Sequence, residues 1–118
     1  MIENFGIGID IVDISRFRNQ PFEEKKTFYG KIFNEKEIKY CLQFNDPYPH
    51  FAGKFAVKEA VIKSIEKKIK LSEIETEIID LKPKVKLTGK YSNEYYFKIS
   101  ISHEKYTAVG IVISEKII

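Results

Sequence analysis

The chain has 118 residues, of which 43% are hydrophobic and 31% charged, a balance typical of a water-soluble globular protein. This length predicts a single domain over residues 1–118, with a core that requires neither disulfides nor a structural metal. The 20 Lys and Arg residues outnumber 17 Asp and Glu residues, for a net charge of +3. That mild bias favours anionic ligands or acidic partners and is too weak for a nucleic-acid-binding signature.

Three features of the sequence lead us to expect a cytoplasmic protein. No apolar run approaches the ~20 residues that span a bilayer, so we expect no membrane association. The first ten residues lack the basic segment and apolar stretch of a signal peptide. The single Cys41 can form no internal disulfide, which fits a reducing compartment.

Residues 2–12 predict a first strand with two unlike faces. One face carries Phe5, Ile7, Ile9 and Ile11, and we expect it to be core. The other carries Gly6, Gly8 and Asp10, where bare backbone allows a ligand or a second element to approach closely. A carboxylate on such a strand is costly to desolvate unless a positive charge meets it. The residues alone leave two roles open for Asp10, a structural pairing or a place in a functional site.

A short helix is expected after the mixed pattern of residues 14–31. Asn34 and Glu37 have the spacing of a capping box, in which Asn34 caps the helix and Glu37 reaches back to it. The helix should run to about Phe44 with Cys41 on its apolar face. We therefore interpret Cys41 as a small buried hydrophobe and not as a nucleophile.

The strongest helical pattern runs from His50 to about Lys68. Large apolar side chains gather on one part of its surface, and alanines lie further round. The first group is Phe51, Phe55 and Ile62, and the second is Ala52, Ala56 and Ala60. Lys54 and Lys58 are expected on the solvated side of this helix.

Glu59 projects between these two groups, and Lys63 follows it at position i+4. One interpretation is an ordinary salt bridge within the helix, which contributes only about 0.2–0.5 kcal/mol. The other is that Glu59 faces Asp10 of the first strand and that the two carboxylates form a hard-cation site. Mg²⁺ needs only one or two carboxylates where substrate phosphates supply further ligands.

Four strands are expected in the C-terminal half, over Glu75–Leu81, Lys84–Thr88, Tyr95–Ser102 and Tyr106–Ser114. A short connection that begins at His103 joins the last two strands into a hairpin. The residues alone leave open whether His103 has a structural or a functional role. Lys82, Lys84 and Lys86 alternate as a solvated edge face. Strands around a helical middle predict an α+β fold, a mainly antiparallel sheet packed on one long helix with shorter helices.

Three stretches together resemble the holo-acyl-carrier-protein synthase family, the small type of 4′-phosphopantetheinyl transferase. They are GIGIDIVDISR near the N-terminus, FAGKFAVKEAVIKS in the long helix and SISH before the last hairpin. NEKEIKYC, ahead of the long helix, is also similar to the family. The order and spacing of these stretches agree with the family pattern over most of the chain.

The resemblance implies Mg²⁺-dependent transfer of 4′-phosphopantetheine from coenzyme A to a serine of apo acyl carrier protein, in support of fatty acid biosynthesis. It implies a catalytic set of Asp10, Glu59 and Lys63, with the two carboxylates binding the metal. Lys63 and His103 are implied to lie beside the coenzyme, and Arg16 to face the acidic carrier protein. The base that accepts the serine proton is left open between Glu59 and a metal-bound water. The family is typically homotrimeric, with active sites between neighbouring subunits.

Two segments depart from the family pattern. DLKPKVKL keeps only Lys82-Pro83 of the usual Gly-Lys-Pro turn, and KYSNEYYFK is shorter than the segment that commonly precedes SxSH. Both lie where the coenzyme pocket would be shaped, so no residue is assigned to the adenine end.

Two other functions are weighed against the enzyme. One is a small basic RNA- or ribosome-binding α+β domain that uses its Lys-rich strands with Tyr91, Tyr95 and Tyr96. The other is a non-catalytic family member that binds coenzyme A or the carrier. Retention of Asp10, Glu59 and Lys63 argues against that last alternative, because a site without activity has no need for charges on apolar faces.

Overall fold

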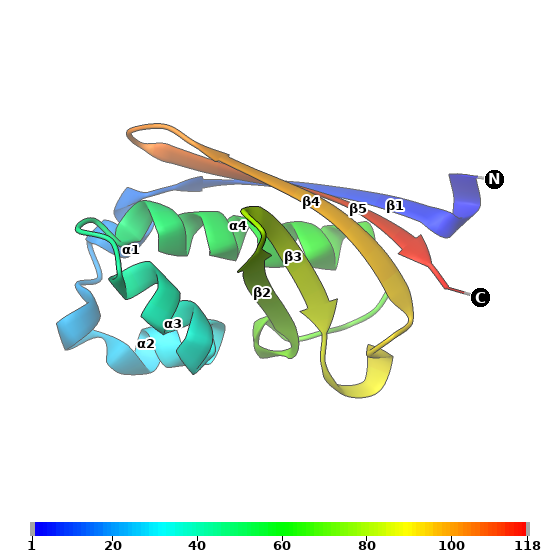
Figure 1. Cartoon of the computed structure of the whole chain (residues 1–118), viewed down its shortest axis with the longest axis horizontal. Helices are drawn as coiled ribbons and strands as arrows, with labels where there is room; N and C mark the ends of the chain where they lie inside the picture. Colours follow the sequence, from blue (N-terminus) through cyan, green and yellow to red (C-terminus); the bar gives the residue numbers. More distant parts are fainter. Residues whose placement is uncertain (1, 118) are drawn as a thin grey trace.

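A computed structural model describes residues 2–117 of the chain. Its main sheet has three antiparallel strands in the order β1 (Phe5–Asp13), β5 (Thr107–Lys116) and β4 (Tyr95–His103). This sheet lies along the helix α4 (Tyr48–Ser64), which fills the middle of the molecule (Figure 1). The predicted α+β class and the antiparallel sheet on one long helix are confirmed.

The smaller elements pack on the side of α4 that faces away from this sheet and at one end of the helix (Figure 1). Three short helices follow β1: α1 (Ser15–Arg18), α2 (Lys26–Ile32) and α3 (Glu35–Leu42). A separate hairpin pairs β2 (Ile74–Ile79) with β3 (Lys82–Leu87). Short 3-10 helices cover Ile2–Asn4, Phe22–Glu24, Leu71–Glu73 and Gly89–Tyr91. None of the helices in residues 2–117 is long and apolar enough to cross a bilayer.

The expectation that the isoleucine face of β1 is core is wrong. Ile7, Ile9 and Ile11 are 67%, 57% and 71% exposed, on the outer face of the sheet. The glycine face packs on α4 instead: a Cβ added to Gly8 would lie 1.9 Å from the carbonyl oxygen of Ala60. Because β1 has no side chains at these glycines, its backbone approaches the helix more closely than a row of isoleucines allows.

The expectation that Lys54 and Lys58 lie on a solvated side of α4 is also wrong. The helix is enclosed by the sheet, by the β2–β3 hairpin and by the short helices, so Lys54 and Lys58 are 4% and 1% exposed. The Lys58 ammonium lies 2.8 Å from Glu37 Oε1 and donates to the carbonyl oxygen of Ile32 at 2.8 Å. A helix that is apolar on most of its circumference is buried on most of its sides, and Lys54 and Lys58 are buried with it.

Helix α4 spans Tyr48–Ser64, so it begins two residues before the expected start and ends four residues before Lys68. Pro49 fits in the first turn because that turn needs no amide hydrogen. At the other end the backbone turns to an extended conformation at Ile65, whose side chain is 7% exposed. Burial of Ile65 and a hydrogen bond from Ser114 Oγ to the carbonyl oxygen of Ser64, at 2.9 Å, hold this end in place.

Other local predictions are confirmed. Asn34 and Glu37 form the capping box of α3, with both hydrogen bonds at 2.8 Å. Cys41 is fully buried, and burial raises the pKa of its thiol to about 12, so it is not a thiolate nucleophile. The hairpin that begins at His103 connects β4 and β5, although β5 extends to Lys116. The exposed face of β3 carries Lys82, Lys84 and Lys86.

Candidate active site

Asp10 is paired with Lys63. The Lys63 ammonium donates to Asp10 Oδ1 at 3.1 Å and to the carbonyl oxygen of Ile9 at 3.0 Å. The Asp10 side chain is 17% exposed and the Lys63 side chain 53%, so the pair lies at the boundary between core and solvent. The strand carboxylate therefore has the positive neighbour that its partial burial requires.

Glycines on two strands make this pairing possible. Asp10 lies opposite Gly110 of β5, where an added Cβ would be 2.7 Å from the backbone nitrogen of Val57. Gly8, two residues before Asp10 on the same face of β1, contacts the backbone of Ala60. Because both strands are bare there, α4 packs directly beneath them, and its Lys63 side chain reaches the edge strand.

Glu59 lies one turn before Lys63 on the same side of α4, and its side chain is half-buried. It takes part in none of the ion pairs formed among residues 2–117. The salt bridge within the helix, one of the two interpretations of the sequence, is therefore not formed, because Lys63 bonds Asp10.

The donor set at this position suits a hard cation. Lys63 occupies only Oδ1 of Asp10, and the bonds found within residues 2–117 leave its Oδ2 free. In that same range no cluster of three or more His, Cys, Asp and Glu side chains could by itself hold a metal. Asp10 and Glu59 could each contribute a carboxylate, and one or two carboxylates together with phosphate oxygens suit Mg²⁺.

His103 lies on the opposite edge of the sheet from Asp10. Asp10 is on β1, β5 lies between, and His103 ends β4 level with Val12, two residues further along than Asp10, so the two residues are roughly 12 Å apart in the plane of the sheet. The expectation that Asp10 binds the metal and that His103 lies beside the same coenzyme stays a prediction.

A second group of basic side chains surrounds His103, and only His103 was singled out from the sequence. The His50 and His103 rings are 5.9 Å apart, and both line a cavity of about 60 Å³ together with Lys54. Lys54 donates to Thr76 Oγ1 at 3.0 Å, and its ammonium lies 4.8 Å from the centre of the Tyr40 ring. Burial lowers the pKa of Lys54. The sequence feature that could have identified Lys54 as buried is the apolar circumference of α4, which predicts buried lysines.

Arg16 lies on α1, near the end of the molecule that carries the short helices. Its side chain is exposed, and its guanidinium lies 4.8 Å from the centre of the Phe55 ring. The neighbouring Arg18 is neutralised by Asp46, at 2.8 Å. Arg16 therefore presents a positive charge on α1 that, unlike the charge of Arg18, is not neutralised by Asp46.

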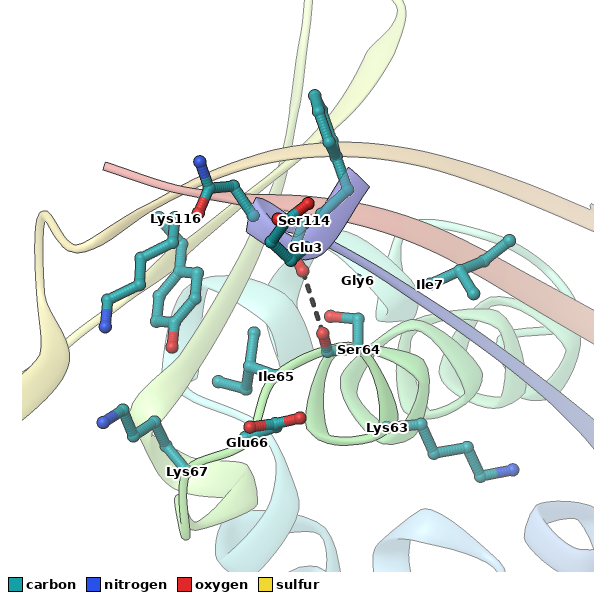
Figure 2. A pocket seen from close by; sticks show the side chains of 13 residues that line it. Glu3, Gly6, Ile7, Lys63, Ser64, Ile65, Glu66, Lys67, Ser114 and Lys116 are labelled. Atoms are coloured by element: carbon teal, nitrogen blue, oxygen red, sulfur yellow. Dashed lines mark hydrogen bonds between the residues drawn. The ribbon is translucent and has the colours of Figure 1, made fainter. Parts of the chain in front are cut away.

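A larger cavity, of about 330 Å³, lies where the end of α4 meets the start of β1 (Figure 2). Lys63 lines it, and so do Glu66 and Lys67 of the segment that follows α4. Lys116 of β5 lies across from these residues.

The fold and the site together define the class of protein. The sequence profile described as the 4′-phosphopantetheinyl transferase superfamily matches residues 6–112, and the chain belongs to this superfamily.

Named relatives narrow the similarity further. The holo-[acyl-carrier-protein] synthase of Thermodesulfovibrio yellowstonii is 42% identical over 116 residues, which cover 96% of this chain and 98% of that protein. The synthase of Clostridium tetani is 37% identical, with coverage of 93% and 94%.

Solved structures agree with the sequence relatives. The holo-(acyl-carrier-protein) synthase of Bacillus anthracis, solved in complex with coenzyme A (3′,5′-ADP), has a TM-score of 0.78 and 30% identity, covering 95% of this chain and 96% of that one. The Helicobacter pylori synthase in complex with coenzyme A has a TM-score of 0.79 and 30% identity, with coverage of 92% and 99%.

Proposed function

We propose that this protein is a holo-[acyl-carrier-protein] synthase that uses Mg²⁺ and supports fatty acid biosynthesis. It transfers 4′-phosphopantetheine from coenzyme A to a serine of apo acyl carrier protein and releases 3′,5′-ADP. The observation that carries this proposal is the Asp10–Lys63 pair, with Glu59 one turn away, in a chain that is similar over almost its whole length to synthases of that name.

In this reaction the serine oxygen bonds to the phosphorus that carries pantetheine, and the bond from that phosphorus to the bridging oxygen breaks. Negative charge grows on the bridging oxygen, which leaves with 3′,5′-ADP. Lys63 neutralises part of this charge, and Asp10 and Glu59 would hold a Mg²⁺ that would supply further positive charge. The exposure of Lys63 supports its role, because its ammonium can move from Asp10 to a phosphate.

We further propose a homotrimer with active sites between subunits. Two observations support self-association: the outer face of the sheet exposes Ile7, Ile9 and Ile11, and Asp10 and His103 lie on opposite edges of one sheet. A neighbouring chain can bring its own His103 beside the Asp10 of the first, so that one coenzyme contacts both.

The acidic carrier protein docks at α1 in this proposal. The exposed Arg16, stacked on Phe55, offers a planar cation with fixed orientation for a carboxylate. We also propose a cytoplasmic location, which the free, buried Cys41 supports.

A mass measurement tests the transfer. Apo acyl carrier protein incubated with this protein, coenzyme A and Mg²⁺ should gain the mass of one phosphopantetheinyl group. Asp10→Ala and Glu59→Ala should each abolish the gain while the far-ultraviolet circular dichroism is unchanged. Glu24→Ala, which removes an exposed carboxylate of the 3-10 helix Phe22–Glu24, is the matched control and should transfer normally. Undiminished transfer by both site variants would refute the metal-site assignment.

The alternative of an RNA-binding surface fits the structure less well. Tyr95 and Tyr96 are neighbours on β4, so their side chains point to opposite faces of the sheet and form no common stacking platform. Tyr96 is 64% exposed, whereas Tyr91 and Tyr95 are half-buried. Steep salt dependence of RNA binding with no response to coenzyme A is the result that would favour this alternative.

A further inference from the structure

His50 and His103 form a close pair at one end of the molecule. His50 lies in the first turn of α4, and His103 is the last residue of β4. Figure 1 shows the start of α4 and the connection between β4 and β5 at the same end of the molecule. The centres of the two imidazole rings are 5.9 Å apart, and their planes are inclined at 68°. Both rings line one small cavity, so a ligand that reaches one ring also lies close to the other.

Of the two rings, that of His50 is the one held by its neighbours. It is stacked on the Phe44 ring, with the ring centres 3.6 Å and the planes 12° apart, and the Tyr40 ring centre is 6.3 Å away. His50 is half-buried, whereas His103 is exposed. His50 therefore provides a fixed surface against which the exposed His103 ring packs.

Both rings keep their nitrogen atoms available. None of the side-chain hydrogen bonds or ion pairs found within residues 2–117 involves the ring of His50 or of His103. The cavity that they line, of about 60 Å³, has room for water. Protons can therefore reach the pair from solvent.

The charges around the pair are more positive than negative. The titratable side chains nearest to it in space or in sequence are Tyr40 on α3, Asp46 before α4, Lys54 on α4, and Glu104 and Lys105 after β4. Asp46 is already paired with Arg18 at 2.8 Å, and Glu104 and Lys105 carry opposite charges. Lys54 lines the same cavity as the two rings. The hairpin of β2 and β3 contributes only the apolar Ile78 to that cavity.

These surroundings keep His50 uncharged at neutral pH in the free protein. Burial lowers the pKa of His50, and His103 and Lys54 lower it further, whereas Asp46 acts in the opposite direction. A bound anion reverses the balance, because it stabilises an imidazolium close to it. Two imidazoles this close titrate as a coupled pair, so the proton drawn in by an anion belongs to both.

We propose that His50 is a positioning residue for His103 and that the two histidines together couple the binding of coenzyme A to the uptake of a proton from solvent. The inference rests on the proposed function, in which His103 lies beside the coenzyme, and extends it to His50 and to regulation by pH. The complex then binds more protons than the free protein does. The affinity for coenzyme A therefore rises as the pH falls.

The test compares two exchanges of His50. His50→Phe keeps a ring between Phe44 and His103 and cannot bind a proton, whereas His50→Ala removes the ring as well. Tyr106→Phe, an aromatic exchange at a position that is 68% exposed between β4 and β5, is the matched control. The Kd of coenzyme A is measured by calorimetry on the full chain with Mg²⁺, at about pH 8 and about pH 6. Two buffers of different ionisation enthalpy give the number of protons taken up.

From the higher to the lower pH, the Kd of coenzyme A should fall about threefold more for the unmodified protein than for His50→Phe. The unmodified protein should also take up more protons. At the higher pH, His50→Phe should bind coenzyme A within about twofold of the unmodified protein, and His50→Ala about fivefold more weakly, because His103 has lost its support. Tyr106→Phe should behave as the unmodified protein does at both pH values.

Two results would overturn the proposal. Equal pH dependence and equal proton uptake in the unmodified protein and His50→Phe refute the coupling to a proton. Equal affinity of His50→Ala and His50→Phe at the higher pH refutes the positioning role.

Failure of this inference is distinguishable from failure of the proposed function. If the unmodified protein transfers phosphopantetheine and His50→Phe keeps the full pH dependence, only the role of His50 is wrong. If the unmodified protein does not bind coenzyme A and transfers nothing, the function itself is refuted, and the inference with it.

Discussion

Two charged side chains of this protein, Glu37 and Lys58, are buried in the core. The Glu37 carboxylate accepts hydrogen bonds from Lys58 Nζ, from the backbone of Asn34, and from both the backbone and the hydroxyl of Thr76. Thr76 in turn accepts a hydrogen bond from Lys54. This network ties α3, α4 and β2 together, and the side chains of Glu37 and Lys58 are 0% and 1% exposed. A buried pair is tolerated in the core when all of its polar atoms are hydrogen-bonded, because each charge compensates the other.

Breaking that pair should be strongly destabilising. Glu37→Gln leaves the Lys58 ammonium buried without a counter-charge, so the free energy of unfolding should fall by about 3–5 kcal/mol. Urea denaturation at fixed protein concentration measures it. The double variant Glu37→Gln with Lys58→Met removes both charges and should recover much of the loss. A decrease below about 1 kcal/mol in the single variant would contradict the compensation argument.

His50 should make stability depend on pH. Burial lowers the pKa of His50 below its usual 6.5, and nearby His103 and Lys54 lower it further, whereas Asp46 acts in the opposite direction. The unfolded chain therefore binds a proton more readily than the folded one. As the pH falls below 6.5, the free energy of unfolding should decrease, and the decrease should end once the pH is below the pKa of His50 in the folded protein.

Urea denaturation at about pH 7.5 and about pH 5.5 measures this effect. His50→Phe keeps a ring stacked on Phe44, from which the His50 ring is 3.6 Å away, and removes the titration. The variant should therefore lose less stability between the two pH values than the unmodified protein does. An identical loss in both would show that His50 does not contribute.

At the scale of elements, the contact between β1 and α4 determines the site. Gly6 and Gly8 are where the backbone of β1 meets that of the helix, and an added Cβ would lie 1.7 Å and 1.9 Å from the carbonyl oxygens of Ser64 and Ala60. Neither carbonyl can yield without moving α4. The spacing between strand and helix therefore also sets the distance from Asp10 to Lys63.

Gly8→Ala should separate β1 from α4 and lower the thermal midpoint by many degrees, with loss of transfer. The reason is a clash between two backbones, which no side-chain rotation relieves. Gly30→Ala is the matched control: Gly30 is helical in α2, and an added Cβ there meets nothing within 4 Å. It should raise stability by about 0.5–1 kcal/mol. Scanning calorimetry distinguishes the two, and a mild effect of Gly8→Ala would contradict the close contact.

At the scale of the whole molecule, the exposed isoleucine face of the sheet supports self-association. Isoleucines at 57–71% exposure lie side by side on β1, and Ile113 of β5, which is 46% exposed, continues the same face. A monomer rarely exposes so continuous an apolar patch. The proposed trimer covers it with the same face of neighbouring chains.

Ile9→Arg should convert the trimer into monomers, because it places a charge at the centre of the apolar face. Light scattering coupled to size exclusion measures the molar mass, and phosphopantetheine transfer should be lost together with assembly. Leu42→Arg is the control, since Leu42 is 43% exposed on α3, away from the sheet. A monomeric unmodified protein with full activity is the result that refutes the inter-subunit site.

Much of the site was readable in the sequence because it depends on local pattern. Alternation placed Asp10 on a glycine-lined face, helical periodicity placed Glu59 and Lys63 on one side of α4, and the capping box of Asn34 and Glu37 formed as expected. Each of these depends on residues only a few positions apart, where backbone geometry fixes relative direction. Helix caps and the face on which a residue lies are therefore determined by the local sequence.

Only the tertiary structure decided which of those faces is buried. Period-two alternation separates the two faces of β1 and contains no information on which one meets α4, and the same holds for Lys54 and Lys58 around the helix. The pairing of Asp10 with Lys63 spans 53 positions, and the separation of Asp10 from His103 follows from the strand order. Such contacts arise from close packing between distant segments, so local periodicity leaves them undetermined.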